Sequence, residues 1–156
     1  HGFLSIVTTT VSVSADGLTY TNNKRVSAAT TTPGPDIVIL GDANRVTVIG
    51  NESWHLTISN NIAVLIAQAA LVVNELNCGN NLVYSVNTSN TTSAILLTTS
   101  ATTGSGMIYN NLVRGLDVAG ALMITAAAVQ YGVFNNYYQA DAGTSGELVP
   151  PAGVNT

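Results

Sequence analysis

The sequence predicts an all-β protein, namely a β-sandwich of the jelly-roll or immunoglobulin-like kind with an extended N-terminal strand. Short runs of β-branched and aromatic residues recur along the 156-residue chain. Turn-forming residues, such as Asp16-Gly17 and a series of Asn doublets, separate these runs. The result is about eight to ten short strands, a number typical of a sandwich. One or two short helices remain an alternative in two apolar stretches.

The first fifteen residues, HGFLSIVTTTVSVSA, form the extended strand, and they contain no charged side chain from residue 2 to residue 15. A strand without Lys, Pro or charge invites pairing with another strand. We therefore expect residues 1–15 to insert as a donor strand into a neighbouring subunit, burying apolar side chains. Pairing within the chain's own sandwich is the alternative. The side chains expected to carry the contact are Phe3, Leu4, Ile6, Val7, Val11 and Val13.

Turn- and strand-breaking residues divide the chain into four predicted segments. After the donor strand, residues 16–35 form a linker with a first hairpin, which ends at Pro33-Gly34-Pro35. Residues 36–140 form the body of the sandwich, and residues 141–156 form an irregular C-terminal arm.

Within the body, Ile37–Leu40, Arg45–Gly50 and Trp54–Ile58 have the composition or alternation of strands. Residues 62–73 and 118–133 are apolar on all sides, so their length favours helices and their β-branched residues favour buried strands. For residues 62–73 we favour a long strand.

Asn doublets stand at five places in the chain, and Asn suits tight turns because it tolerates the left-handed backbone region. Their spacing is irregular, so the sequence predicts no internal repeat. The doublets occupy positions 22–23, 60–61, 80–81, 110–111 and 135–136.

Composition limits the classes of partner. Only 8% of the residues are charged and the net charge is −4, so the chain lacks the clustered cations that nucleic acid requires. No apolar run reaches the ~18 residues of a membrane-spanning helix. The single Cys78 permits no internal disulfide, and we expect a buried, inert thiol, with an intermolecular bridge as the alternative.

Secretion and glycosylation are both expected. The chain begins with His1 and not with Met, which favours removal of a secretory signal peptide and an extracellular location. N-x-Ser/Thr sequons occur at Asn51, Asn87 and Asn90, so N-glycans are candidate solubilisers of a surface with few charges.

An enzymatic alternative starts from the two histidines. His1-Gly2 at the N-terminus, together with His55, resembles the copper site of lytic polysaccharide monooxygenases. The resemblance implies copper bound by His1 and His55, with Tyr137 or Tyr138 as the axial neighbour. The chain is short for that family and lacks its usual disulfides.

Other catalytic arrangements have little support. The chain contains no G-x-S-x-G motif, and its carboxylates are scattered singly. A carbohydrate-binding role remains open because Trp54 and the Tyr137-Tyr138 pair are able to stack on sugars. A capsid-type subunit is a further alternative. We expect the chain to have no enzymatic activity and to bind no cofactor.

The N-terminal strand, the Thr-, Asn- and Ser-rich body, the sequons and the low charge together resemble subunits of extracellular prokaryotic filaments. These filaments, which include archaeal threads, bundling pili and TasA-like biofilm fibres, assemble by donor-strand exchange. The resemblance implies a homopolymer that acts in adhesion or biofilm formation and has no active site.

Overall fold

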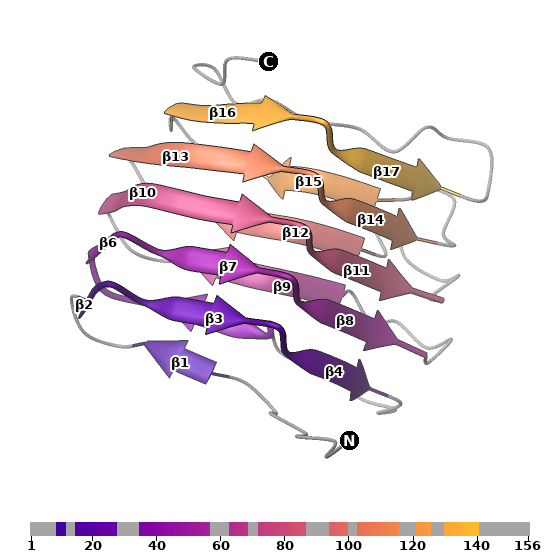
Figure 1. Cartoon of the computed structure of the whole chain (residues 1–156). Helices are drawn as coiled ribbons and strands as arrows, with labels where there is room; N and C mark the ends of the chain where they lie inside the picture. The colour runs from indigo at the N-terminus through magenta and orange to yellow at the C-terminus, as the bar shows by residue number, and fades with distance from the viewer. Residues whose placement is uncertain are drawn as a thin grey trace.

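The computed structural model describes residues 9–11, 15–27, 35–56, 63–68, 72–86, 94–99, 103–115, 121–125 and 130–140. Within these ranges the chain is all-β and has no helix, which confirms the predicted class. The strands wind into a parallel β-helix in which five successive coils stack along one axis (Figure 1). Each coil contributes to three parallel sheets, A, B and C.

The strands of each sheet follow the order of the coils. Sheet A contains β1 (Thr9–Val11), β5 (Ile37–Ile39), β9 (Ala63–Gln68), β12 (Ala94–Thr99) and β15 (Ala121–Thr125). Sheet B contains β2 (Ala15–Asp16), β3 (Thr19–Thr21), β6 (Ala43–Asn44), β7 (Thr47–Ile49), β10 (Val72–Gly79), β13 (Thr103–Tyr109) and β16 (Gln130–Phe134). Sheet C contains β4 (Lys24–Ser27), β8 (Glu52–His55), β11 (Leu82–Ser85), β14 (Leu112–Gly115) and β17 (Tyr137–Ala140).

The predicted β-sandwich is not confirmed, because every pairing between the described strands is parallel. Sandwiches of the predicted kind are built from antiparallel sheets. Alternation of polar and apolar residues reports which face of a strand is buried and does not report the direction of its neighbour. The pattern therefore predicted the all-β class correctly and left the topology open. It also predicted about eight to ten strands, where the described residues contain seventeen.

The core fills the space between the three sheets with aligned columns of apolar side chains. In sheet B, one buried column runs from Tyr20 through Val48, Cys78 and Ile108 to Val133. In sheet A, Ile37, Ile66 and Leu97 occupy matching positions of three coils and are at most 1% exposed. Because each coil alone exposes these side chains above and below, stacking of coils is what buries them.

Three predicted elements change in this topology. Residues 62–73 and 118–133 contribute strands, as favoured for the first, but each stretch supplies parts of two strands, β9 with β10 and β15 with β16. The predicted hairpin within residues 16–35 is not formed by β3 and β4, because β3 pairs with β7 and β4 pairs with β8. β3 and β4 belong, with β1 and β2, to the first coil of the stack.

Candidate assembly surface

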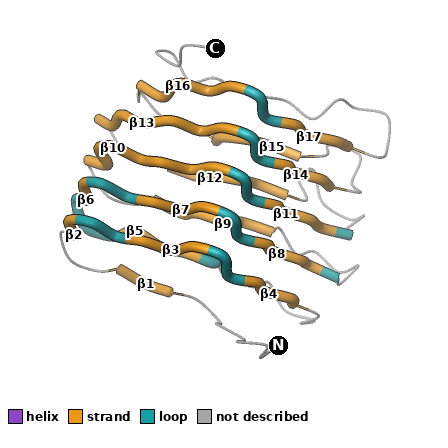
Figure 2. The backbone as a smooth tube through the Cα atoms, viewed as in Figure 1, coloured by secondary structure: helices purple, strands orange, loops and turns teal. Residues whose placement is uncertain are grey.

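The turn between sheets B and C has the same short form in every coil (Figure 2). Its first residue has a positive φ, between 52° and 55° where it is Asn and 69° where it is Gly50. Asn tolerates this conformation better than other residues with a Cβ. The four asparagines at this position are Asn22, Asn80, Asn110 and Asn135.

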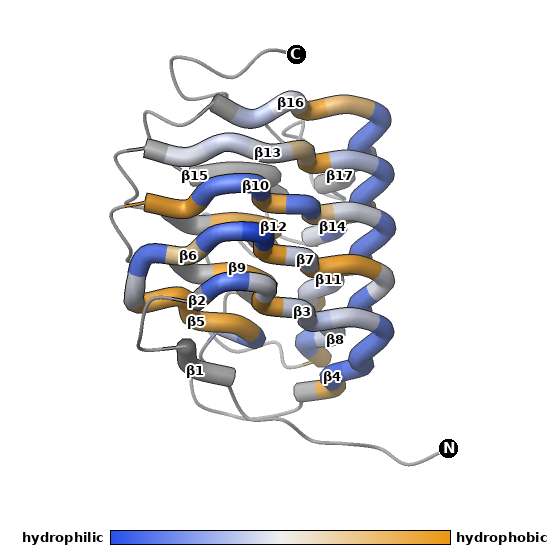
Figure 3. The backbone as a smooth tube through the Cα atoms, turned by 60° about the vertical axis from the view of Figure 1, so that its left-hand side comes forward, coloured by the Kyte–Doolittle hydropathy of each residue, from blue (hydrophilic) through white to orange (hydrophobic). Residues whose placement is uncertain are grey.

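The second residue of each of these turns is also Asn, and its side chain points into the stack. We call these five residues the asparagine ladder: Asn23, Asn51, Asn81, Asn111 and Asn136. Its three middle members are at most 2% exposed. In Figure 3, hydrophilic residues recur one above another along this edge of the stack.

Hydrogen bonds connect the ladder from coil to coil in one direction. Except in the last coil, the backbone N–H and the Nδ2 of each ladder asparagine donate to the Oδ1 of the ladder asparagine in the next coil. These N···O distances are 3.0 and 3.1 Å from Asn23, and 3.0 and 2.9 Å from each of Asn51, Asn81 and Asn111.

The ladder also satisfies backbone carbonyls of sheet B. The Nδ2 of a ladder asparagine donates to a buried carbonyl of the preceding coil, at 2.9 Å for Asn81 with Val48 and at 3.1 Å for Asn111 with Cys78. Asn51 and Asn136 make the equivalent bonds to Tyr20 and Ile108. Buried polar groups are costly unless they are paired, so the ladder stabilises the sharp corner in every coil.

Both ends of the stack present strands that have one neighbouring strand among the described residues. At the N-terminal end these are β1, β2, β3 and β4, and at the C-terminal end they are β15, β16 and β17. The outer edge of each such strand carries backbone donors and acceptors, which form a template for another strand.

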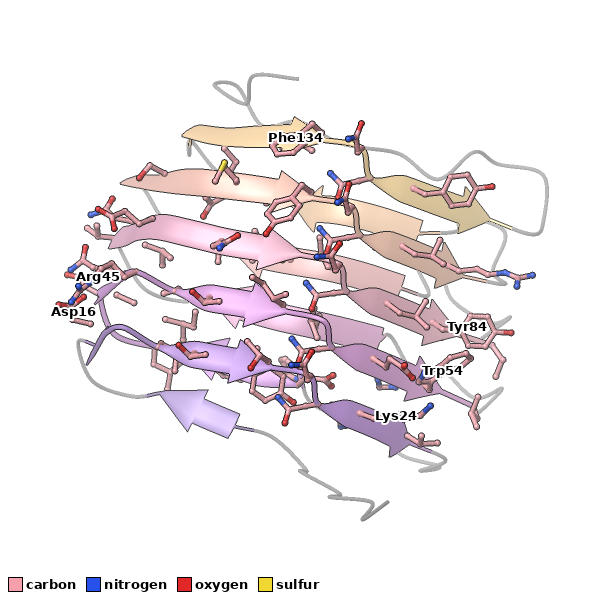
Figure 4. All side chains as sticks on the ribbon, viewed as in Figure 1. Asp16, Lys24, Arg45, Trp54, Tyr84 and Phe134 are labelled. Carbon is pink, nitrogen blue, oxygen red and sulfur yellow. The ribbon has the colours of Figure 1, made fainter. Side chains whose placement is uncertain are left out.

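Aromatic and charged side chains line the outer face of sheet C (Figure 4). The rings of Trp54 and Tyr84 lie 5.0 Å apart and are tilted by 56°. Lys24 Nζ lies 5.4 Å from the centre of the Trp54 ring, and the Arg114 guanidinium lies 5.6 Å from that of Tyr84. Each of the two rings therefore has a cation close to it, a favourable arrangement on the surface of sheet C.

A polar cluster lies inside the first two coils. Arg25 and Asp36 form a buried ion pair, and the side chains of Ser53 and His55 are at most 1% exposed. Burial and the nearby charge of Arg25 lower the pKa of His55 to about 4. His55 is therefore neutral in the folded protein at neutral pH.

The buried imidazole should make stability depend on pH. Between pH 6.5 and 4 the unfolded chain protonates His55 and the folded chain does not, so the free energy of unfolding should fall as the pH falls. The expected loss by pH 4 is up to about 3 kcal/mol. We expect urea unfolding at a series of pH values to show this loss in the wild type and to lack it in His55→Leu. Carboxylates titrate in both proteins, so parallel pH profiles of the two would contradict the assignment.

The predicted donor-strand residues fall mostly outside the described residues, which include Val11 but not Phe3, Leu4, Ile6, Val7 or Val13. Val11 belongs to β1, and its register partner is Ile39 of the same chain. Residues 9–11 therefore follow the alternative of pairing within their own subunit.

Of the three predicted glycosylation sites, Asn51 is the one that the structure describes, and its side chain lies inside the stack, which does not fit the prediction. It is 2% exposed, and its Nδ2 donates to both Tyr20 and Asn81. A glycan on that nitrogen would remove a ladder hydrogen and has no space inside the stack. Asn87 and Asn90 lie outside the described residues.

The predicted copper ligands are not brought together among the described residues. His1 and Tyr138 offer no described side chain, and His55 faces the interior, where it is 1% exposed. Tyr137 is 60% exposed on the outer face of sheet C. Within the described part of the chain, no group of three or more His, Cys, Asp or Glu side chains has the proximity of a metal site.

Cys78 is buried as expected, and burial raises the pKa of its thiol to about 12. A thiol with so high a pKa carries almost no thiolate at neutral pH and is inert.

The ladder itself was missed by sequence reasoning. Its signal was present in the doublets, but Gly50-Asn51 replaces Asn-Asn in the second coil, and the doublet at 60–61 lies outside the described residues. With Gly50-Asn51 included and 60–61 omitted, successive ladder asparagines are separated by 28, 30, 30 and 25 residues. This near-regular period is the signature of a solenoid.

No described helix has the length and hydrophobicity needed to cross a membrane. Comparison with protein-family models, with curated proteins and with solved structures yields no match to this chain.

Proposed function

We propose that the chain is a structural subunit of an extracellular filament, a homopolymer whose copies add strands to one another. The observation that supports this is the pair of open ends, where three parallel sheets each finish on a strand with one described neighbour. Strand addition at both ends of a stack repeats without closing, and a contact of this type produces a fibre. The proposed role is mechanical and not catalytic.

The surface chemistry fits this role. Only 8% of residues are charged, so electrostatic repulsion between copies is weak. Assembly would also bury part of a surface that has few charges to keep it soluble. Exposed apolar side chains occur in the last coil, where Phe134 is 46% and Tyr137 is 60% exposed. An extracellular setting accords with the sequons at Asn87 and Asn90.

The position of β1 changes the proposed route of assembly. Its three residues pair with β5 of their own chain, so they act as the edge strand of sheet A and not as an inserted strand. A neighbour then extends sheet A beyond β1. Donor-strand insertion by the rest of residues 1–15 is the alternative route.

Electron microscopy of the purified full-length chain over a range of concentrations tests the proposal. We expect unbranched filaments with an axial repeat of about 24 Å, because five coils spaced about 4.8 Å apart make one subunit. Their yield should depend weakly on salt, since the contact is not ionic. Sedimentation as a folded monomer at every concentration would contradict the proposal.

A peptide of residues 1–15 separates the two routes. In excess it should leave filament growth unchanged if copies stack by their coil ends. It should block growth if the same residues insert into a neighbour as a donor strand.

A further inference from the structure

The asparagine ladder is polar, and its two ends are complementary. In every internal step the coil nearer the N-terminus provides the donors and the next coil provides the accepting Oδ1. Within the described residues no donor reaches Oδ1 of Asn23, and the backbone N–H of Asn136 has no acceptor. The first coil therefore offers an acceptor where the last coil offers a donor.

The backbone beside the ladder has the same complementarity. In each step, the residue after one ladder asparagine donates its N–H to the carbonyl of the ladder asparagine in the preceding coil. Examples are Glu52 to Asn23 and Tyr137 to Asn111, both with an N···O distance of 2.8 Å. By the same pattern, Lys24 N–H in the first coil fits the carbonyl of Asn136 in the last.

We propose, on the basis of the filament function above, that two copies meet head to tail with Asn136 of one copy donating to Oδ1 of Asn23 in the next. The partner of each end is thus a second copy of this chain, and the ladder runs through the interface without a break. Two like ends do not fit, because acceptors would face acceptors or donors would face donors. The interface is heterologous, and growth has one direction.

The outer columns continue across this interface in the same register. In sheet C, Leu112 pairs with Tyr137 in the last step, and Lys24 pairs with Glu52 in the first. Tyr137 of one copy and Lys24 of the next are therefore register partners, which places an aromatic ring beside a cation, a favourable pairing. In sheet B, Phe134, stacked on Tyr109 at 5.5 Å, is placed beside Thr21 of the neighbour.

Disulfide trapping tests the register. Cα atoms of register partners in adjacent strands lie about 5 Å apart, within the range of a disulfide. Lys24→Cys combined with Tyr137→Cys should therefore give a series of covalent dimers, trimers and longer oligomers on oxidation. Both positions are exposed, and within one monomer they lie in the first and fifth strands of sheet C, too far apart to link.

The matched control is Lys24→Cys with Leu112→Cys. Leu112 lies one coil further from the interface than Tyr137, so the distance between the two substituted Cα atoms across the interface is about doubled. The in-register pair should cross-link at least about tenfold faster, given the narrow distance range of a disulfide. Equal rates in the two proteins, with normal filaments in the microscope, would overturn the proposed register and leave the filament function standing. A wild type without filaments would overturn both.

Asn23→Ala tests the ladder bond directly. In the monomer, Asn51 Oδ1 still accepts from the backbone N–H of residue 23, so no buried group loses its last partner. The melting temperature should change little, whereas the critical concentration for polymerisation should rise at least about tenfold, because the two hydrogen bonds from the N–H and Nδ2 of Asn136 to Asn23 Oδ1 are lost. An unchanged critical concentration would contradict the continuous ladder.

Discussion

Asn81→Ala should lower the free energy of unfolding by about 4 kcal/mol, because it interrupts the ladder at its centre. The substitution removes four hydrogen bonds of 2.9–3.0 Å, which link Asn81 to Val48, Asn51 and Asn111. One buried backbone donor, the Asn51 N–H, then loses its acceptor, and the Val48 carbonyl loses one of its donors. Each buried orphan of this kind costs about 1–3 kcal/mol.

Asn74→Ala is the matched control for this substitution. Asn74 also bonds to an asparagine of the adjacent coil, Asn44, with an N···O distance of 3.1 Å, but on the exposed side of sheet B. Water replaces that bond, so the expected change is within about 0.5 kcal/mol. Chemical denaturation of the two variants at one pH measures the difference, and similar losses in both would show that the ladder does not stabilise the fold.

Gly106→Ala should destabilise the protein by about 3–5 kcal/mol, because the new methyl group has no space and the backbone is strained. A Cβ at this position would overlap the Leu76 carbonyl oxygen and would lie 2.6 Å from the Leu76 nitrogen. Both are strand backbone atoms of β10, which cannot move without breaking the pairing with β13. The φ of Gly106 is 151°, a conformation that residues with a Cβ rarely adopt.

The close approach at Gly106 arises from an irregularity in strand pairing. Val73 faces Gly104 and Leu76 faces Gly106, so two residues of β10 stand opposite one residue of β13. Glu75 in this bulge has a φ of 52°. Such bulges bend a strand, and a glycine opposite allows the two backbones to approach.

Gly132→Ala, in the last coil, provides the control for Gly106→Ala. A Cβ there meets one backbone atom, the Gly106 carbonyl oxygen, at 3.9 Å, which is an ordinary contact. Loss of unfolded-state entropy should make this variant neutral or more stable by up to about 1 kcal/mol. Thermal unfolding of both variants checks the pair. A smaller loss for Gly106→Ala than for Gly132→Ala would contradict the account of the bulge.

The ladder gives one set of residues two roles. Within a subunit it pairs the buried polar groups at the corner of each coil, and in the proposed filament it continues that pairing between subunits. The same chemistry at an internal step and at the interface explains why the interface needs no dedicated motif in the sequence. Stability of the coil and growth of the polymer should therefore respond to different ladder positions, Asn81 for the first and Asn23 for the second.

Local features of the chain were readable from its residues. The runs around Ile37, Val48 and Val83 are strands because they are short and rich in β-branched and apolar residues. Asn22, Asn80, Asn110 and Asn135 mark turns because Asn accepts a positive φ. These properties depend on neighbours in sequence, so sequence alone decided the β class and most turn positions.

The arrangement in space depended on contacts between residues about 30 positions apart. The local sequence around a Val or an Asn does not depend on whether the partner strand runs parallel or antiparallel. Nor does the local sequence show that the side chain of the second Asn in each doublet points into the stack. Stacking of coils buries Asn51 as a ladder residue, although its local sequence is a glycosylation signal. Only the tertiary structure decided these points, because the free energy that selects them comes from pairing and burial between successive coils.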